Sequence, residues 1–169
     1  MNTTSILLIC GVFGVCFILM IPAYYFAKRL KSKAADFVEN NKNRAVVRFY
    51  SDKAKINGQK LKTFDCSKGR DMETIVALNP GKYTISGKFS AQDLAITGNQ
   101  KYEMPKPVDI DVELEGGYIY TIGLYFEKPY EVAVETDSKV AAALELKVSG
   151  LLSKHKEAYV ICLKSKEYI

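Results

Sequence analysis

The hydrophobic and polar positions of this chain change period twice along its length. Residues 6–26 form an almost unbroken apolar run, and no charged side chain precedes residue 28. Apolar residues then recur at helical spacing as far as residue 38, and beyond residue 43 they alternate with polar residues as in β-strands. The pattern divides the chain into an anchor at residues 1–27, a basic juxtamembrane stalk at 28–43 and a β-domain at 44–169.

The apolar run is interpreted as a retained transmembrane helix. At ~1.5 Å of rise per residue, a helix over residues 6–26 spans the ~30 Å hydrocarbon core of a bilayer. A cleaved signal peptide is disfavoured, because no Lys or Arg precedes the run and Tyr25 occupies the −3 position of a cleavage site at Ala27. Four basic residues then end the span: Lys28, Arg29, Lys31 and Lys33.

This basic flank also predicts an orientation. Lys and Arg near the end of a span are retained on the cytoplasmic side, and here only the C-terminal flank carries them. We therefore expect the N-terminus outside and the domain in the cytoplasm. The alternative is that the flank only stops an anchor whose direction is set by other machinery.

The alternation beyond residue 43 predicts a mainly β domain. Its cleanest strand is Val108–Leu114, where every second residue is hydrophobic. Short strands separated by turn residues at this spacing indicate an antiparallel β-sandwich of about seven to nine strands. The turns are Asn57-Gly58, Asn79-Pro80-Gly81 and Gly116-Gly117.

Three segments give weaker patterns. Tyr130–Thr136, after Pro129, is predicted as a strand. Residues 138–152 fit both periods: three consecutive Ala favour a C-terminal helix, whereas the β-rich surroundings favour a strand, which we expect. Gln92–Lys106 is expected to be less regular, with one short apolar patch at Leu94–Ile96.

Three stretches carry a pattern seen in known families: Lys55–Gly58, Ile75–Ile85 and Gly116–Tyr120. They hold a strand ending at Asn-Gly, a strand closing at Pro-Gly-Lys and a Gly–aromatic strand start. The pattern resembles small bacterial β-sandwich modules, namely PEGA domains, carboxypeptidase-regulatory-like domains and uncharacterised lipoprotein domains. The resemblance implies a β-sandwich that serves as a non-catalytic appendage, with a helix here in place of the lipoprotein cysteine.

Charge and cysteine content narrow the function classes. The 169 residues carry a net charge of +5 at pH 7, most of which is the basic flank, so a nucleic-acid surface is not indicated. No C-x-x-C pair occurs, which leaves zinc and thioredoxin-type sites without support. Within the domain, Cys66 and Cys162 are expected to be separate thiols, with Cys162 in a core strand. A disulfide between them is the alternative if the domain faces an oxidising compartment.

Catalytic signatures are absent from the sequence. His155 is the only histidine and lies in a polar run, where a solvated loop residue is expected. Neither a Gly-x-Ser-x-Gly nor a phosphate-binding loop occurs. We therefore expect no catalytic, cofactor-binding or metal-ligating residues, no cofactor and no enzyme activity.

The candidate interaction surface has two parts. Asp109, Asp111 and Glu113 stack on one strand face at ~7 Å intervals, where a solvated face is expected and a partner-binding stripe or a calcium site is the alternative. Tyr118 and Tyr120 either fill the edge of the core or mark a carbohydrate- or protein-binding surface.

These observations favour a single-pass membrane protein whose β-sandwich is a non-catalytic protein-binding or assembly module. Its expected partners are the bilayer and either other proteins or further copies of itself. An extracytoplasmic domain that binds carbohydrate or calcium is the first alternative and requires the opposite orientation. An unrecognised enzyme is the second alternative.

Overall fold

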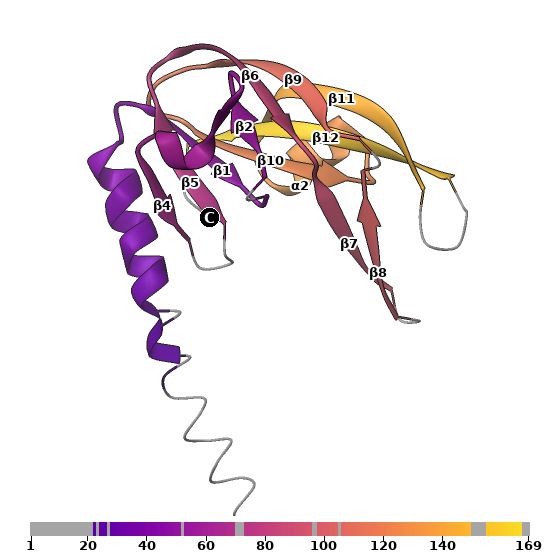
Figure 1. Ribbon diagram of the computed structural model, residues 1–169, viewed down its shortest axis with the longest axis horizontal. Coiled ribbons are helices and arrows are strands. Elements are labelled where there is room, and N and C mark those ends of the chain that lie inside the picture. The colour runs from indigo at the N-terminus through magenta and orange to yellow at the C-terminus, as the bar shows by residue number, and fades with distance from the viewer. Residues whose placement is uncertain are drawn as a thin grey trace, which may run out of the picture.

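The computed structural model describes residues 22, 24–26, 28–51, 53–69, 73–95, 98–104, 106–149 and 155–166. They form a mainly β domain with two sheets, as predicted, and an N-terminal helix that extends from one side (Figure 1). The six-stranded sheet has the order β11-β12-β10-β1-β5-β4, and the four-stranded sheet has the order β3-β2-β6-β9. Strands β7 and β8 pair as a separate hairpin.

The elements have the following bounds. The six-stranded sheet contains β1 (Ala45–Phe49), β4 (Cys66–Lys68), β5 (Thr74–Leu78), β10 (Ile119–Tyr125), β11 (Lys139–Ser149) and β12 (His155–Ser165). The four-stranded sheet contains β2 (Lys55–Ile56), β3 (Gln59–Lys60), β6 (Gly81–Gly87) and β9 (Val108–Leu114). The remaining elements are β7 (Ser90–Ala95), β8 (Gly98–Glu103), the 3-10 helix η1 (Leu61–Thr63), α2 (Pro129–Glu135) and the N-terminal helix, described at residues 22, 24–26 and 28–40.

The core lies between the two sheets because alternate residues of their strands point toward each other. Val47, Phe49 and Ile122 enter it from the six-stranded sheet, and Ile85 and Val112 enter it from the four-stranded sheet. The opposite face of β9 is exposed, as the alternation in its sequence predicts.

The predicted Asn57-Gly58 hairpin is confirmed. Both residues have positive φ, +48° and +77°, and Ile56 pairs with Gln59 across the turn. The Asn57 side-chain oxygen also accepts a hydrogen bond from the Thr84 backbone N–H at 2.8 Å, which ties the turn to β6. Asn and Gly occupy this turn because they adopt positive φ at the lowest cost.

The prediction of a wholly antiparallel arrangement is wrong at the centre of the six-stranded sheet. Strands β1 and β10 run parallel, with Val46 opposite Ile119 and Phe49 opposite Ile122. Hydrophobic periodicity reports which face of a strand is buried but not the direction of its neighbour. The many residues between β1 and β10 supply the long crossover that a parallel pair needs.

The strand predicted at Tyr130–Thr136 is also wrong, because this segment forms α2. Its sequence alternates in the manner of a strand, but Val132 alone is buried, against β12, while Val134 is 81% exposed. Pro129 suits the first turn of a helix, and the Glu131 carboxylate accepts the Lys128 backbone N–H at 3.1 Å. Over so short a segment, the proline and the capping contact at the start of the helix outweigh the alternation of hydrophobic residues.

The ambiguous segment at 138–152 is a strand as far as it is described, so the helix alternative is wrong. β11 pairs antiparallel with β12 from Lys139↔Lys164 to Ser149↔His155, and residues 150–152 lie outside the described part. Pairing with a neighbouring strand outweighs the helix propensity of the three Ala residues. His155, expected in a loop, begins β12.

The less regular segment predicted at Gln92–Lys106 is in fact largely the β7–β8 hairpin. The two strands pair from Ser90↔Glu103 to Ala95↔Gly98. The sequence signal is weak because few of the residues in this segment are hydrophobic, so a period of two is hard to recognise.

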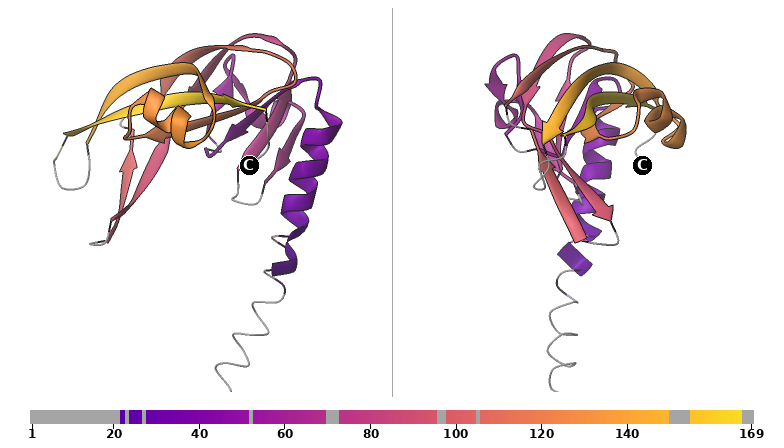
Figure 2. Two further views of the ribbon diagram at one scale, coloured as in Figure 1. Left: turned by 180° about the vertical axis from the view of Figure 1, so that it is seen from behind. Right: turned by 90° about the vertical axis from the view of Figure 1, so that its right-hand side faces the viewer.

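The helical spacing predicted after the basic flank is confirmed, but the helix is not a free stalk. Ala34 is fully buried, and it packs with half-buried Phe37 and Val38 of the helix against Val46 and Ile119 of the six-stranded sheet. The helix and α2 therefore cover the face of this sheet that points away from the four-stranded sheet (Figure 2).

The connection between the helix and β1 is fixed by backbone contacts. The Gly117 N–H donates to the Arg44 carbonyl at 3.1 Å, and the Val46 N–H donates to the Tyr118 carbonyl at 3.0 Å. A Cβ at Gly116 would lie 2.6 Å from the Asn43 carbonyl oxygen, so only glycine allows this approach. The boundary predicted at residue 43 is thus a packed junction.

A buried ion pair lies on the same outer face of the six-stranded sheet. The Arg48 guanidinium contacts the Glu73 carboxylate at 2.8 Å, and the two side chains are only 11% and 2% exposed. The Tyr50 hydroxyl lies 3.1 Å from the same guanidinium. A Cβ at Gly69 would meet the Glu73 carboxylate directly, so the glycine leaves the space in which this carboxylate sits.

We expect Ala34→Glu to release the helix from the sheet, because the substitution places an unpaired charge at a fully buried position. Trypsin cleavage after Lys42 and Arg44 should then be about tenfold faster or more, since ~1.4 kcal/mol of lost docking raises the open population tenfold. Ala35→Glu is the matched control, because Ala35 is exposed. Equal cleavage rates in the two variants would contradict the docking.

We expect Glu73→Leu to lower the free energy of unfolding by about 3–5 kcal/mol, because it leaves the Arg48 guanidinium buried without its carboxylate. The double variant Arg48→Leu/Glu73→Leu should recover most of this loss, since it removes both charges. Urea unfolding of the full chain in a neutral detergent, followed by circular dichroism, measures both. A single variant as stable as the parent would show that water reaches the pair.

Candidate binding surfaces

The predicted acidic stripe is on the exposed face of β9, at one edge of the four-stranded sheet. Asp109, Asp111 and Glu113 are all exposed there. Thr84 of β6 donates to the Asp111 carboxylate at 2.7 Å, and Lys82 of β6 stands directly opposite Glu113. Within the part of the chain that the structure describes, no group of three or more His, Cys, Asp or Glu side chains is arranged to hold a metal ion.

The two candidate tyrosines have different surroundings. Tyr120 is fully buried in the core, where its hydroxyl accepts the Glu115 backbone N–H at 2.8 Å and burial raises its pKa. Its side chain is therefore not part of a surface. Tyr118 is half-buried, and the Lys164 ammonium lies 3.9 Å from the centre of its ring, within cation–π range.

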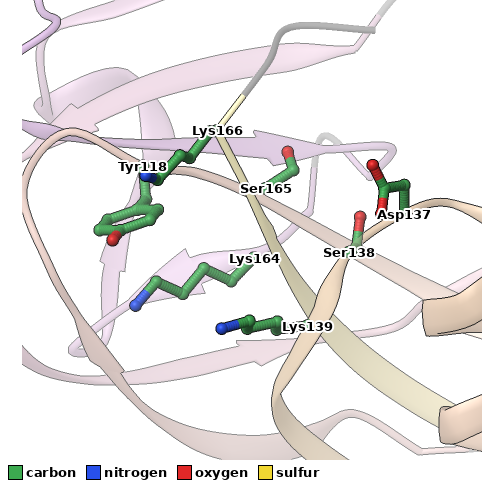
Figure 3. Close-up of a pocket in the computed structure, with 7 residues that line it drawn as sticks. All are labelled: Tyr118, Asp137, Ser138, Lys139, Lys164, Ser165 and Lys166. Carbon is green, nitrogen blue, oxygen red and sulfur yellow. The ribbon is translucent and has the colours of Figure 1, made fainter.

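Tyr118 borders a basic hollow of about 460 Å³ at the junction of β10, β11 and β12. Figure 3 shows the residues that line it: Tyr118, Asp137, Ser138, Lys139, Lys164, Ser165 and Lys166. Lys139 and Lys164 are direct cross-strand partners, so their charges repel each other. The Glu115 carboxylate contacts the Lys164 ammonium at 2.7 Å and raises the pKa of Lys164. This ion pair offsets the repulsion between the two lysines.

A second basic cleft, of about 660 Å³, lies at the edge where β4 of one sheet approaches β2 and β3 of the other. We call it the lysine cleft, defined by the residues that line it: Lys53, Ala54, Lys55, Lys60, Leu61, Lys62, Cys66, Ser67, Lys68 and Thr74. None of these residues is acidic. Sequence reasoning missed this cleft, although its signal is the density of lysines between residues 53 and 68.

The basic flank is described at all four positions. Lys28, Arg29, Lys31 and Lys33 are exposed on the N-terminal helix. Most of the predicted anchor, residues 1–21, 23 and 27, lies outside the described residues. Among the residues that are described, no helix is both long and apolar enough to cross a membrane.

The cysteines of the domain are separate thiols, as expected. Cys66 is exposed on β4, and Cys162 is buried on β12, where burial raises its pKa to about 12. Three strands lie between β4 and β12, so at ~4.8 Å per strand spacing the two residues are ~19 Å apart. A disulfide needs Cα atoms within ~7 Å. The alternative of a disulfide is therefore wrong, and the redox state of these thiols does not report the compartment.

No protein family, curated protein or solved structure matches the chain. The resemblance to PEGA-like, carboxypeptidase-regulatory-like and lipoprotein-type modules therefore stays a prediction from the turn residues alone.

Proposed function

We propose that this chain is a single-pass membrane protein whose β-sandwich is a non-catalytic binding or assembly module on the cytoplasmic side of the membrane. The observation that carries the proposal is the docking of the N-terminal helix. Ala34 of this helix is fully buried against the six-stranded sheet, only a few residues beyond the basic flank. A helix that leaves a bilayer at this flank holds the domain in one orientation.

The placement of the β7–β8 hairpin supports the same arrangement. Its strands project from the side of the domain toward which the N-terminal end of the helix also points, in all three views (Figures 1 and 2). This side of the domain faces the bilayer if the helix enters it. The opposite side is then free to meet a partner.

The distribution of charge supports binding as the activity of the module. The lysine cleft lies at the β3 edge of the four-stranded sheet, and the acidic stripe lies at its β9 edge. Opposite charges at opposite edges favour partners of defined polarity and orientation, including further copies of the chain.

The orientation is tested by labelling Cys66 with a membrane-impermeant maleimide. This thiol is exposed, whereas the Cys162 thiol is buried and protonated at neutral pH. We expect sealed, right-side-out membranes to remain unlabelled until they are permeabilised. The Cys66→Ser variant is the control that assigns the label. Labelling of Cys66 in intact membranes would place the domain outside and favour an extracytoplasmic ligand-binding domain.

The assembly role is tested by chemical crosslinking in native membranes. We expect the lysines of the exposed surfaces to yield crosslinked species of higher mass, either with other proteins or between copies. Mass spectrometry of these species identifies the lysines involved. A chain that remains uncrosslinked at every expression level would contradict an assembly module.

A further inference from the structure

β11 is an edge strand of the six-stranded sheet and is 11 residues long. It pairs with β12 on one side, and none of the strands that the structure describes pairs with it on the other side. An edge strand presents a row of backbone N–H and C=O groups that can pair with a further strand. A bulge between Val140 and Ala142 interrupts the first part of β11, so residues 143–149 form its regular part.

This regular part of β11 extends past the neighbouring strands of its sheet. The last pair between β10 and β12 is Tyr125↔Tyr159, whereas β11 and β12 remain paired as far as Ser149↔His155. The β11–β12 hairpin therefore projects to one side of the domain (Figure 2). Two strands alone are marginally stable in water, so a further strand beside β11 would stabilise this projection.

The other described edges of the two sheets are protected against such pairing. β3 has two residues and β4 has three, which leaves little backbone to pair. β9 has seven residues, but Asp109, Asp111 and Glu113 occupy its exposed face, so a second β9 beside it would bring like charges together. β11 instead carries side chains of both signs in its regular part, Glu145 and Lys147.

The charges of β11 complement those of a second β11 in one antiparallel register. When Leu146 lies opposite Leu146 of the second copy, Glu145 of each copy lies opposite Lys147 of the other. Signs then alternate across the exposed face, because Lys147 also lies opposite Glu157 of β12. A shift of two residues in either direction places Glu145 opposite Glu145 or Lys147 opposite Lys147, so like charges oppose both neighbouring registers.

The inner face of the same strand is apolar. Ala142, Leu144 and Leu146 pack against the core but remain only half-buried. Glu145 and Lys147 are exposed on the opposite face. Residues directly opposite in an antiparallel pair point to the same face. A second β11 in this register therefore places apolar side chains beside the half-buried leucines and charged side chains beside the exposed ones.

We propose that β11 pairs antiparallel with β11 of a second copy about a two-fold axis at Leu146. The contact is self-complementary, as a two-fold interface requires, and it joins two six-stranded sheets into one continuous sheet. The inference rests on the proposed function as an assembly module and deepens it by naming the surface and the partner.

The first test measures dimer dissociation for the full chain by sedimentation equilibrium in a neutral, density-matched detergent. We expect Glu145→Lys and Lys147→Glu each to weaken the dimer by about tenfold or more, because each replaces two pairs of opposite charges with two pairs of like charges. An equimolar mixture of the two variants should recover the dimer, because each copy then carries the charges that complement the other.

The matched control is Glu113→Lys, which makes the same change of charge on the exposed face of β9. It should change dimer affinity by less than about threefold. Circular dichroism verifies that every variant folds.

Disulfide crosslinking tests the register, in a chain whose Cys10, Cys16 and Cys66 are replaced by Ser. Under mild oxidation, Leu146→Cys should form a covalent dimer, because the two copies of residue 146 are direct cross-strand neighbours. Ala143→Cys should not, because residue 143 lies opposite residue 149 of the second copy and the two copies of residue 143 are then ~20 Å apart.

A parent chain that stays monomeric, or charge variants that dimerise as tightly as the parent, would overturn the proposal. Failure of the mixture to recover the dimer, or crosslinking at residue 143 but not at 146, would also overturn it. A monomeric chain that crosslinks through β11 to another protein in native membranes would overturn the pairing of copies alone. The proposed binding function would then stand, whereas it fails if no crosslink to any protein forms.

Discussion

The two-sided burial of β1 is the constraint on which the rest of the structure depends. Val47 and Phe49 point into the core between the sheets, and Val46 points outward beneath the N-terminal helix. The strand pairs antiparallel with β5 on one side and parallel with β10 on the other. The backbone of β1 thus joins both halves of the six-stranded sheet, and its two faces join this sheet to the core and to the helix.

The sequence predicts the elements whose pattern is local. β9 is found because Val108–Leu114 alternates cleanly, and the β2–β3 hairpin because Asn57-Gly58 specifies its turn. The burial of Val46 is not predicted, because alternation assigns it to the solvent side and the covering helix is known only from the fold. α2 is missed because Val132 and Val134 alternate over so few residues that the period is ambiguous.

A local sequence pattern predicts still less about the candidate surfaces, because their exposure depends on which other segments lie beside them. Tyr118 and Tyr120 look equivalent in the sequence, and only the position of β10 in the sheet separates the half-buried ring from the core residue. The acidic stripe is predicted because its members share one strand. The lysine cleft is missed because β4 belongs to one sheet and β2 and β3 to the other, and the sequence does not show that these sheet edges approach each other. The buried Arg48–Glu73 pair is missed for a similar reason. Arg48 lies in β1, Glu73 immediately precedes β5, and only the fold shows that the two strands are neighbours.

The docked helix has a consequence for how far the domain stands from a membrane. From Lys28 to the buried Ala34, a helix rises only ~9 Å at ~1.5 Å per residue. In an anchored chain this distance is close to the ~8 Å Debye length at physiological ionic strength. The near side of the domain then lies within the electric field of the lipid headgroups, which a long flexible tether would have allowed it to leave. For a chain anchored in this way, lipid composition is part of the local environment of the domain, and a partner approaches along the plane of the membrane or from the far side.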